Sequence, residues 1–357
     1  MNPKNKKYLE LTDDILNKIN TVFSVYEIIH QDNSVILYGV PLVNIKEIYQ
    51  QLFFNLEELG YQFSIEHELG EYFIVISPRQ EPKRRIWINI VLACATFFTT
   101  MIMAAKYMFG VHPLTTPLEI YKGLPFTIAI MTVLGAHEMG HYITAKKRGM
   151  RTSLPYFIPF PNIIGTMGAV IQHRGPIPDR KALFDVGVSG PLVGVVVSVI
   201  VTIIGLMLPT EGTITLPIHY PPLFELLTNI FLEGEKLHPV AFAGWVGMFV
   251  TALNLIPAGQ LDGGHMLRSI LGERSLYVST VMPFLLMSLG ISVTYLLRQN
   301  GFIWMFWGIF LLFFSSMGQP TPLNDEMKLD NKRILLGIIT FGIGLLCFTL
   351  APFKMQF

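Results

Sequence analysis

Seven apolar runs occupy most of the chain after residue 85, and several reach the length of a membrane-crossing helix. Such a helix needs about 20 mostly apolar residues. The runs are Ile86–Phe109, Leu124–Ala145, Leu183–Leu208, Val240–Leu271, Tyr277–Leu297, Phe302–Met317 and Ile334–Phe353. The fourth is interrupted at Pro257 and Gly259, and the sixth is short. We therefore expect a mainly α-helical membrane bundle with about six to seven transmembrane segments.

The composition argues against a soluble protein of this length. Hydrophobic residues make up 51% of the 357 residues and charged residues only 14%, whereas soluble domains carry about 25% charged residues. A soluble core cannot absorb so much apolar surface, so we expect a lipid bilayer to cover it. The net charge of +1 gives no reason to expect a nucleic-acid partner. Two cysteines are too few for a disulfide framework.

Residues 1–82 have the pattern of a small soluble α+β domain. Four short segments alternate or run apolar as strands do, and Asn44–Leu59 repeats its apolar residues at helical spacing. The strand segments are Ser24–Ile29, Val35–Tyr38, Tyr61–Glu66 and Tyr72–Ser77. We expect a hinge with a basic end at 81–85, a membrane core at 83–320 and a C-terminal transmembrane segment at 321–357.

Basic residues cluster at the ends of the apolar runs and predict the orientation. The clusters are Lys83/Arg84/Arg85, Lys146/Lys147/Arg148/Arg151, Arg180/Lys181, Arg268/Arg274 and Lys328/Lys332/Arg333. All five fall on one side if the N-terminus is inside, as the excess of Lys and Arg in cytosolic loops requires. The polar start Met1–Lys7 lacks the apolar stretch of a secretory signal. We expect an integral protein of a prokaryotic cell membrane, favoured by the Lys-, Asn- and Ile-rich composition, with a cytosolic N-terminus.

The segment Leu154–His173 is apolar but cannot form a regular helix. Pro155, Pro159 and Pro161 each remove a backbone donor. Unpaired backbone cannot face lipid, so the segment must dip into a protein-lined cavity or pair as a hairpin. Beside an active site, such an element can offer an edge to a substrate strand. The alternative is an interfacial loop without a role.

The second apolar run ends in Gly135-Ala136-His137-Glu138-Met139-Gly140-His141. On a helix, His137 and His141 lie one turn apart on the same face, where both imidazoles can reach one Zn2+ ion. Glu138 is rotated by about 100° from His137, close enough to serve as a general base. Ionisable residues inside an apolar helix are costly and mark functional sites. The alternative, a polar trio that packs helices together, does not require this spacing.

A zinc site needs a third protein ligand, and the acidic residues at membrane depth are few. No glutamate occurs between Glu138 and Glu211, which leaves Asp185 and Asp262. Asp185 stands near the end of a run, where it can cap a helix or reach the surface. Asp262 lies where the fourth run is broken, and a carboxylate at a helix break is a common ion ligand in membrane proteins. We expect Asp262 to be the third ligand, with His265 as a rival.

These motifs together resemble the site-2 protease family of intramembrane metalloproteases. The resemblance rests on His137–His141, on Asn254, Pro257 and Asp262-Gly263-Gly264, and on Ser189–Gly194, and it covers roughly residues 86–320. Pro155–Pro159 and Gly165–Ala169 look like the inserted membrane hairpin of its archaeal, bacterial and plastid branches.

The resemblance implies that His137, His141 and Asp262 are zinc ligands and that Glu138 is the base. It also implies a role for Asn254 in holding the scissile carbonyl or its oxyanion. The predicted substrates are membrane proteins with a transmembrane helix, which must unwind locally to be cut. The predicted substrate-binding edge is Gly168, Ala169, Val170, Ile171 and Gln172.

Two other functions fit parts of this pattern. In a metal- or proton-coupled transporter, the same residues would form an ion relay, but the first half of the chain has no counterpart of the break at 254–265. The other alternative is an inactive, protease-like membrane chaperone. The retention of Glu138 beside the three expected ligands argues against it.

Overall fold

The computed structural model describes residues 11–31, 33–68, 70–78, 85–209, 218–232, 236–316, 318 and 320–353. They fall into two units, residues 1–84 and residues 85–357, and each unit is described by itself. Apart from Arg85, the hinge predicted at 81–85 lies outside the described residues.

The N-terminal unit is an antiparallel sheet with the strand order β1-β2-β4-β3 and two helices. Its elements are α1 (Asp13–Asn20), β1 (Phe23–Gln31), β2 (Ser34–Pro41), α2 (Ile45–Glu58), β3 (Tyr61–Glu68) and β4 (Glu71–Pro78). Buried Val35 and Leu37 alternate with half-buried neighbours along β2, as a sheet with one covered face requires. The predicted strands and the predicted helix are present. Helix α1 was not predicted, because eight residues carry little periodic signal.

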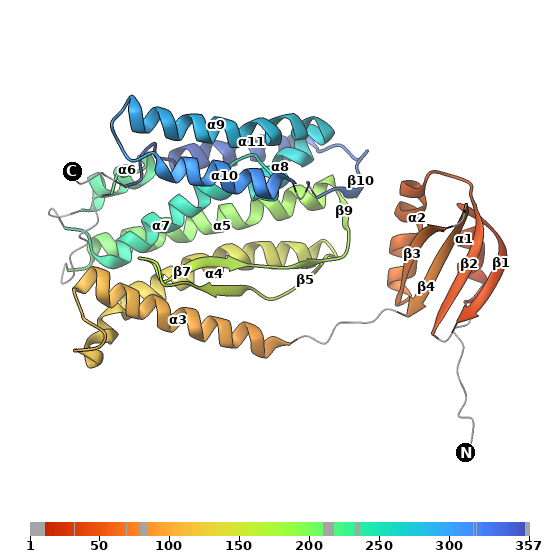
Figure 1. The fold of residues 1–357 in the computed structure, drawn as a ribbon, viewed down its shortest axis with the longest axis horizontal. Coiled ribbons are helices and arrows are strands. Elements are labelled where there is room, and N and C mark those ends of the chain that lie inside the picture. The colour runs from red at the N-terminus through yellow and green to blue at the C-terminus, as the bar shows by residue number, and fades with distance from the viewer. Residues whose placement is uncertain are drawn as a thin grey trace, which may run out of the picture. The chain divides into compact units, whose positions relative to one another are not determined.

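The second unit is a bundle of helices that run back and forth (Figure 1). Its helices are α3 (Ile86–Phe109), α4 (Leu124–Lys147), α5 (Arg180–Met207), α6 (Pro222–Phe231), α7 (Pro239–Asn254), α8 (Asp262–Leu271), α9 (Ser275–Tyr295), α10 (Phe302–Ser316) and α11 (Asn331–Leu346). Four helical runs among the described residues are long and apolar enough to cross a membrane: Ile86–Phe109, Pro117–Lys147, Arg180–Met207 and Asp262–Tyr295. The higher number of six to seven segments stays a prediction.

Helix α11 is shorter than the predicted segment Ile334–Phe353. It begins at Asn331 behind the capping residue Asp330 and ends at Leu346. The residues that follow bond to other parts of the bundle: Trp304 donates its indole N–H to the carbonyl oxygen of Leu350 at 2.6 Å, and Phe353 bridges to Ile218. These contacts replace the last turns of the expected helix.

Helix α5 is central, because it packs against α4, α7 and α8. Small residues allow this close approach. A Cβ atom on Gly140 of α4 would lie only 2.8 Å from the carbonyl oxygen of Ser189 on α5, and one on Gly205 of α5 would lie 2.5 Å from the Cα atom of Ala241 on α7. The glycines therefore set the spacing of the three helices around the site described below.

The predicted interruption of the fourth apolar run is present between α7 and α8. The backbone turns at residues 255–261, where Gly259 has a φ of +55°, a conformation that favours glycine. A Cβ atom on Gly264 would lie 2.7 Å from the carbonyl oxygen of Ala258, so the turn also needs glycine for space. The turn ends at Asp262, which is the first residue of α8.

The segment between α4 and α5 forms short strands rather than helix. These are β5 (Arg151–Thr152), β6 (Tyr156–Pro159), β7 (Thr166–Val170), β8 (His173–Arg174) and β9 (Ile177–Asp179). β6 and β7 pair as an antiparallel hairpin, which is one of the two arrangements predicted for Leu154–His173. β9 pairs in parallel with β10 (Pro322–Asn324), a short strand between α10 and α11.

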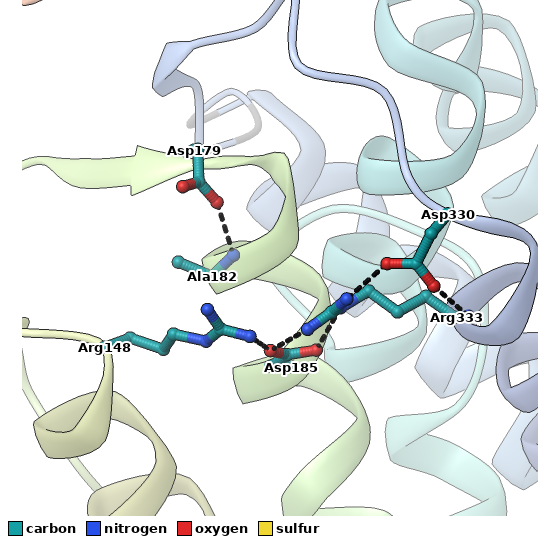
Figure 2. Close-up of polar contacts among 6 residues, drawn as sticks. All are labelled: Arg148, Asp179, Ala182, Asp185, Asp330 and Arg333. Carbon is teal, nitrogen blue, oxygen red and sulfur yellow. Dashed lines mark hydrogen bonds and ion pairs between the residues drawn. The ribbon is translucent and has the colours of Figure 1, made fainter.

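Ion pairs join several helices at the end of the bundle where α4 ends and α5 and α11 begin. Asp185 of α5 binds Arg148, which follows α4, and Arg333 of α11 (Figure 2). Basic residues of two predicted clusters, Arg148 and Arg333, therefore meet at this end. The adjacent Asp330 caps α11 by accepting a hydrogen bond from the Arg333 N–H.

A second cluster lies at the same end of α5. Asp325 accepts hydrogen bonds from Arg180 at 2.8 Å and from Arg268 at 2.7 Å. Burial alone would raise the pKa of Asp325, but these two guanidinium groups hold its pKa below the usual range. The segment that follows α10 is thus tied to both α5 and α8.

Candidate metal centre

His137 and His141 lie on the inner face of α4, and both are buried. Their position follows from the sequence, because residues four apart on a helix share a face. Asp262 reaches the same point from the first turn of α8. Asp262 follows His141 by 121 residues in the sequence. The turn after α7 therefore brings the carboxylate of a distant segment to the imidazoles of α4.

The three side chains converge on one point. The Nε2 atoms of His137 and His141 are 3.1 Å apart, and they lie 3.2 Å and 3.3 Å from the two carboxylate oxygens of Asp262. All three potential ligand atoms lie within 4.8 Å of one another. Two imidazole nitrogens and one carboxylate oxygen, with space for a fourth ligand, form a donor set typical of catalytic zinc sites.

Neighbouring groups orient the imidazoles. The Nδ1 atom of His141 lies 2.8 Å from the carbonyl oxygen of Val186 on α5, and a carbonyl oxygen can only accept, so Nδ1 carries the proton. Nε2 then presents its lone pair to the centre, as a metal ligand must. A Cβ atom on Gly190 would collide with the His141 ring, and one on Gly194 would lie 2.8 Å from Nδ1 of His137. The two glycines thus make room for the imidazoles as well as for close helix packing.

The two rival ligands are placed differently. The Asp185 carboxylate is engaged by Arg148 and Arg333, so it neither caps a helix nor reaches the converging imidazoles. The cap of α5 is Asp179, which accepts from the Ala182 N–H at 2.7 Å. His265 lines the cavity beside the centre, but within the described part of the chain the three-ligand group contains only His137, His141 and Asp262.

Glu138 and Asn254 lie beside the ligands. Two cavities, of about 510 Å³ and 610 Å³, meet at the centre, and both are lined by Glu138 and Asn254. The Asn254 Nδ2 atom is 3.2 Å from Nε2 of His137. Ile171 lines both cavities together with Glu138. A carboxylate and a side-chain amide thus face the same space as the three potential metal ligands.

The predicted substrate-binding residues Gly168–Gln172 border these cavities. Gly168 lines the first, Gln172 lines the second, and Ala169, Val170 and Ile171 line both. β6 pairs with one edge of β7, and no strand in the described part of the chain pairs with the other edge. Gln172, just beyond β7, already bonds Ser153 through its backbone N–H and its carbonyl oxygen.

The sequence prediction missed His173, which directly follows this edge. His173 lines the second cavity with the three ligands and His265. Its Nδ1 atom is buried and has no hydrogen-bond partner in the described structure, and burial lowers the pKa of its imidazole. The residue stands in the proline-rich segment, but no spacing in the sequence connects it with the motif of α4.

Comparisons with known proteins identify a peptidase family that matches this region. Residues 125–293 match the model of peptidase family M50, and this range contains all three converging ligands, Glu138 and Asn254. The N-terminal unit lies outside the matched range.

Two relatives from Arabidopsis thaliana are similar over the same region. One is the probable chloroplastic zinc metalloprotease EGY2, with 32% identity over 250 residues, which are 66% of this chain and 43% of the relative. The other is the probable chloroplastic zinc metalloprotease EGY1, with 29% identity over 64% of this chain and 43% of the relative. The chain thus spans 43% of the length of these relatives.

Among solved structures, a site-2 protease from Methanocaldococcus jannaschii matches 66% of this chain and 91% of its own. The identity is 18% and the TM-score is 0.35, which is too low to establish a common arrangement of helices.

Proposed function

Residues 125–293 of this chain belong to peptidase family M50, and from this premise we propose that the protein is an intramembrane zinc metalloprotease. The observation that carries the proposal is the convergence of His137, His141 and Asp262 within helices of membrane length, with Glu138 beside them. The proposed reaction is the hydrolysis of a peptide bond within or near a transmembrane segment of a membrane protein.

His137, His141 and Asp262 would hold the zinc ion, and their donor types suit it. At this site zinc would supply Lewis-acid chemistry, which polarises a carbonyl and lowers the pKa of water toward about 7. Glu138 is not a ligand, so its carboxylate remains available to accept the proton of the attacking water. The side-chain amide of Asn254 faces the same cavity and would donate a hydrogen bond to the carbonyl oxygen under attack.

The substrate would bind as an extended strand along Gly168–Gln172. A helix hides its carbonyl groups in hydrogen bonds, so a substrate helix must unwind before hydrolysis. The edge of β7 opposite β6 would replace those hydrogen bonds by strand pairing. The position of Ile171, which lines both cavities together with Glu138, supports this placement, because a strand paired at this edge would pass beside the proposed general base.

The protein would lie in a prokaryotic cell membrane as a bundle of six to seven spans, with the end that carries the Asp185 and Asp325 clusters on the cytosolic side. The gathering of basic residues at this end supports that orientation. Residues 1–82 would form a cytosolic domain, 83–320 the protease core and 321–357 a C-terminal span.

The replacement Glu138→Gln tests the proposal. It preserves size and hydrogen bonding to water but removes the proton acceptor. Purified Glu138→Gln protein should fold and retain its zinc, while cleavage of a membrane-protein substrate should fall by at least about 100-fold. Near-normal cleavage by this variant would contradict a protease mechanism. Zinc-dependent ion flux in the parent, without proteolysis, would favour a transporter instead.

A further inference from the structure

The hairpin β6–β7 is held at both ends by one helix, α3. At its start, the Asn89 side chain donates to the carbonyl oxygens of Leu154 and Pro155, each at 2.9 Å. At its turn, the Thr99 hydroxyl lies 2.8 Å from the carbonyl oxygen of Gly165. The same hydroxyl lies 3.1 Å from two carbonyl oxygens of its own helix, so the contact with the hairpin is the shortest of the three.

The spacing of the two contacts matches the length of the hairpin. Asn89 and Thr99 are ten residues apart, since 99 − 89 = 10, which corresponds to about 15 Å along a helix. The strand from Pro155 to Phe160 covers about 16 Å at the usual rise per residue. The helix therefore contacts the hairpin near its two extremities.

The turn of the hairpin also touches the α3 backbone directly. Gly165 has a φ of +85°, and a Cβ atom there would lie 2.7 Å from the backbone nitrogen of Thr100. Asn162 makes the turn rigid, because its side chain accepts from the backbone N–H groups of Ile164 and Gly165 and donates to the carbonyl oxygen of Thr166. A rigid turn that rests on α3 transmits the position of this helix to β7.

The opposite side of the hairpin borders the metal centre. Ala169, Val170 and Ile171 line both cavities there, and Glu138 lines the same two cavities. A shift of the hairpin along α3 would therefore change which backbone groups of β7 lie beside Glu138.

We propose that Asn89 and Thr99 are positioning residues that fix the register of the β7 edge against Glu138 and so select the peptide bond that is cut. This inference rests on the proposed function, in which a substrate strand pairs with that edge. Strand pairing translates a shift of one residue, about 3.3 Å, into a different carbonyl group at the centre. The two side chains thus act on specificity without touching the reacting atoms.

The test compares isosteric variants in the full chain, reconstituted with a membrane-protein substrate that the parent cleaves. Asn89→Leu and Thr99→Val remove the hydrogen bonds at nearly constant volume. We expect products cut at neighbouring bonds, detected by mass spectrometry, and a kcat/KM that is about tenfold lower in the double variant. Zinc content should stay the same, and Thr99→Ser should restore the parental cleavage position.

Thr100→Val is the matched control. Thr100 is buried on the same helix, but among the described residues its hydroxyl bonds only the carbonyl oxygens of Thr96 and Phe97, both in α3 itself. This variant should cut at the parental bond. If it spreads the cleavage as Thr99→Val does, the effect comes from the helix and the proposal is wrong.

Unchanged cleavage position and kcat/KM in the double variant would overturn the positioning role while leaving the protease function intact. A parent that cleaves no membrane protein would instead refute the proposed function. If the double variant does not fold, the cleavage positions of Thr99→Val and Thr99→Ser are compared instead. These two variants differ in whether position 99 keeps a hydroxyl group.

Discussion

The Nδ1 atom of His141 lies 2.8 Å from the main-chain carbonyl oxygen of Val186, so α5 orients a side chain of α4. The residue before Val186 is Asp185, which is bound by Arg148 and Arg333. These contacts connect the proposed metal centre to the ion pairs at the end of the bundle. The alignment of the imidazole therefore depends on residues that bind neither metal nor substrate.

The ligand assignment predicts the metal content. Purified protein should contain about one zinc ion per chain, measured by elemental mass spectrometry. His137→Ala, His141→Ala and Asp262→Ala should each remove most of it, because each takes away one of three ligands. His265→Ala is the control and should keep its zinc. If Asp262→Ala keeps its full zinc content and His265→Ala loses it, His265 and not Asp262 is the third ligand.

The glycines of α5 predict a second effect on the metal. In Gly190→Ala, the new methyl group would collide with the His141 ring, and in Gly194→Ala it would press on His137. Zinc affinity should fall by about 10- to 100-fold, although alanine favours the helix. A competition titration with a chelator measures the change. Gly342→Ala in α11 is the control, since no atom lies within 4 Å of its added Cβ.

The substrate-edge proposal predicts a separation of cleavage from metal binding. Pro or Asp substitutions within Gly168–Gln172 should impair cleavage, because they disturb strand pairing, and they should leave the zinc content unchanged. Val170→Ile, which keeps a β-branched side chain, should cleave normally. Normal cleavage by several Pro and Asp variants would mean that this segment is a surface loop without a role in binding.

The orientation proposal predicts the location of three segments. Reporter fusions after Arg151 and after Arg274 should be cytosolic, because basic residues flank both positions. A fusion in the segment 211–237, which contains α6, should be external. A cytosolic signal from that segment would invert the bundle and place the Asp185 and Asp325 clusters on the outer side.

Local patterns were sufficient to predict much of the fold. Apolar length marks α3, α4, α5 and α9, and Pro257 with its neighbouring glycines marks the turn that ends at Asp262. The i, i+4 spacing by itself places His137 and His141 on one face of a helix. These features depend on residues that are close in sequence, or on composition alone.

Contacts between distant segments were not predictable in the same way. Nothing near His173 indicates that it shares a cavity with Asp262, and nothing near Asp185 identifies Arg333 as its partner. Such contacts follow from the way α4, α5 and α8 pack. The early end of α11 was unpredictable for the same reason. The hydrogen bond from the Trp304 indole to the Leu350 carbonyl oxygen forms only when the helices are packed together.

The ion pair between Arg333 and Asp185 joins residues 148 positions apart, and this separation has a consequence in time. At about 5–20 residues per second, a ribosome needs about 7–30 s to add that stretch. His137, His141, Asp185 and Asp262 are all synthesised before Arg333. During insertion, each new copy therefore passes through an interval in which its three proposed metal ligands have been synthesised, while Arg148 is the one partner of Asp185, among those described, that exists yet. The ion pair between Arg333 and Asp185, which supports the segment that orients the His141 ring, is therefore among the last contacts to form during synthesis.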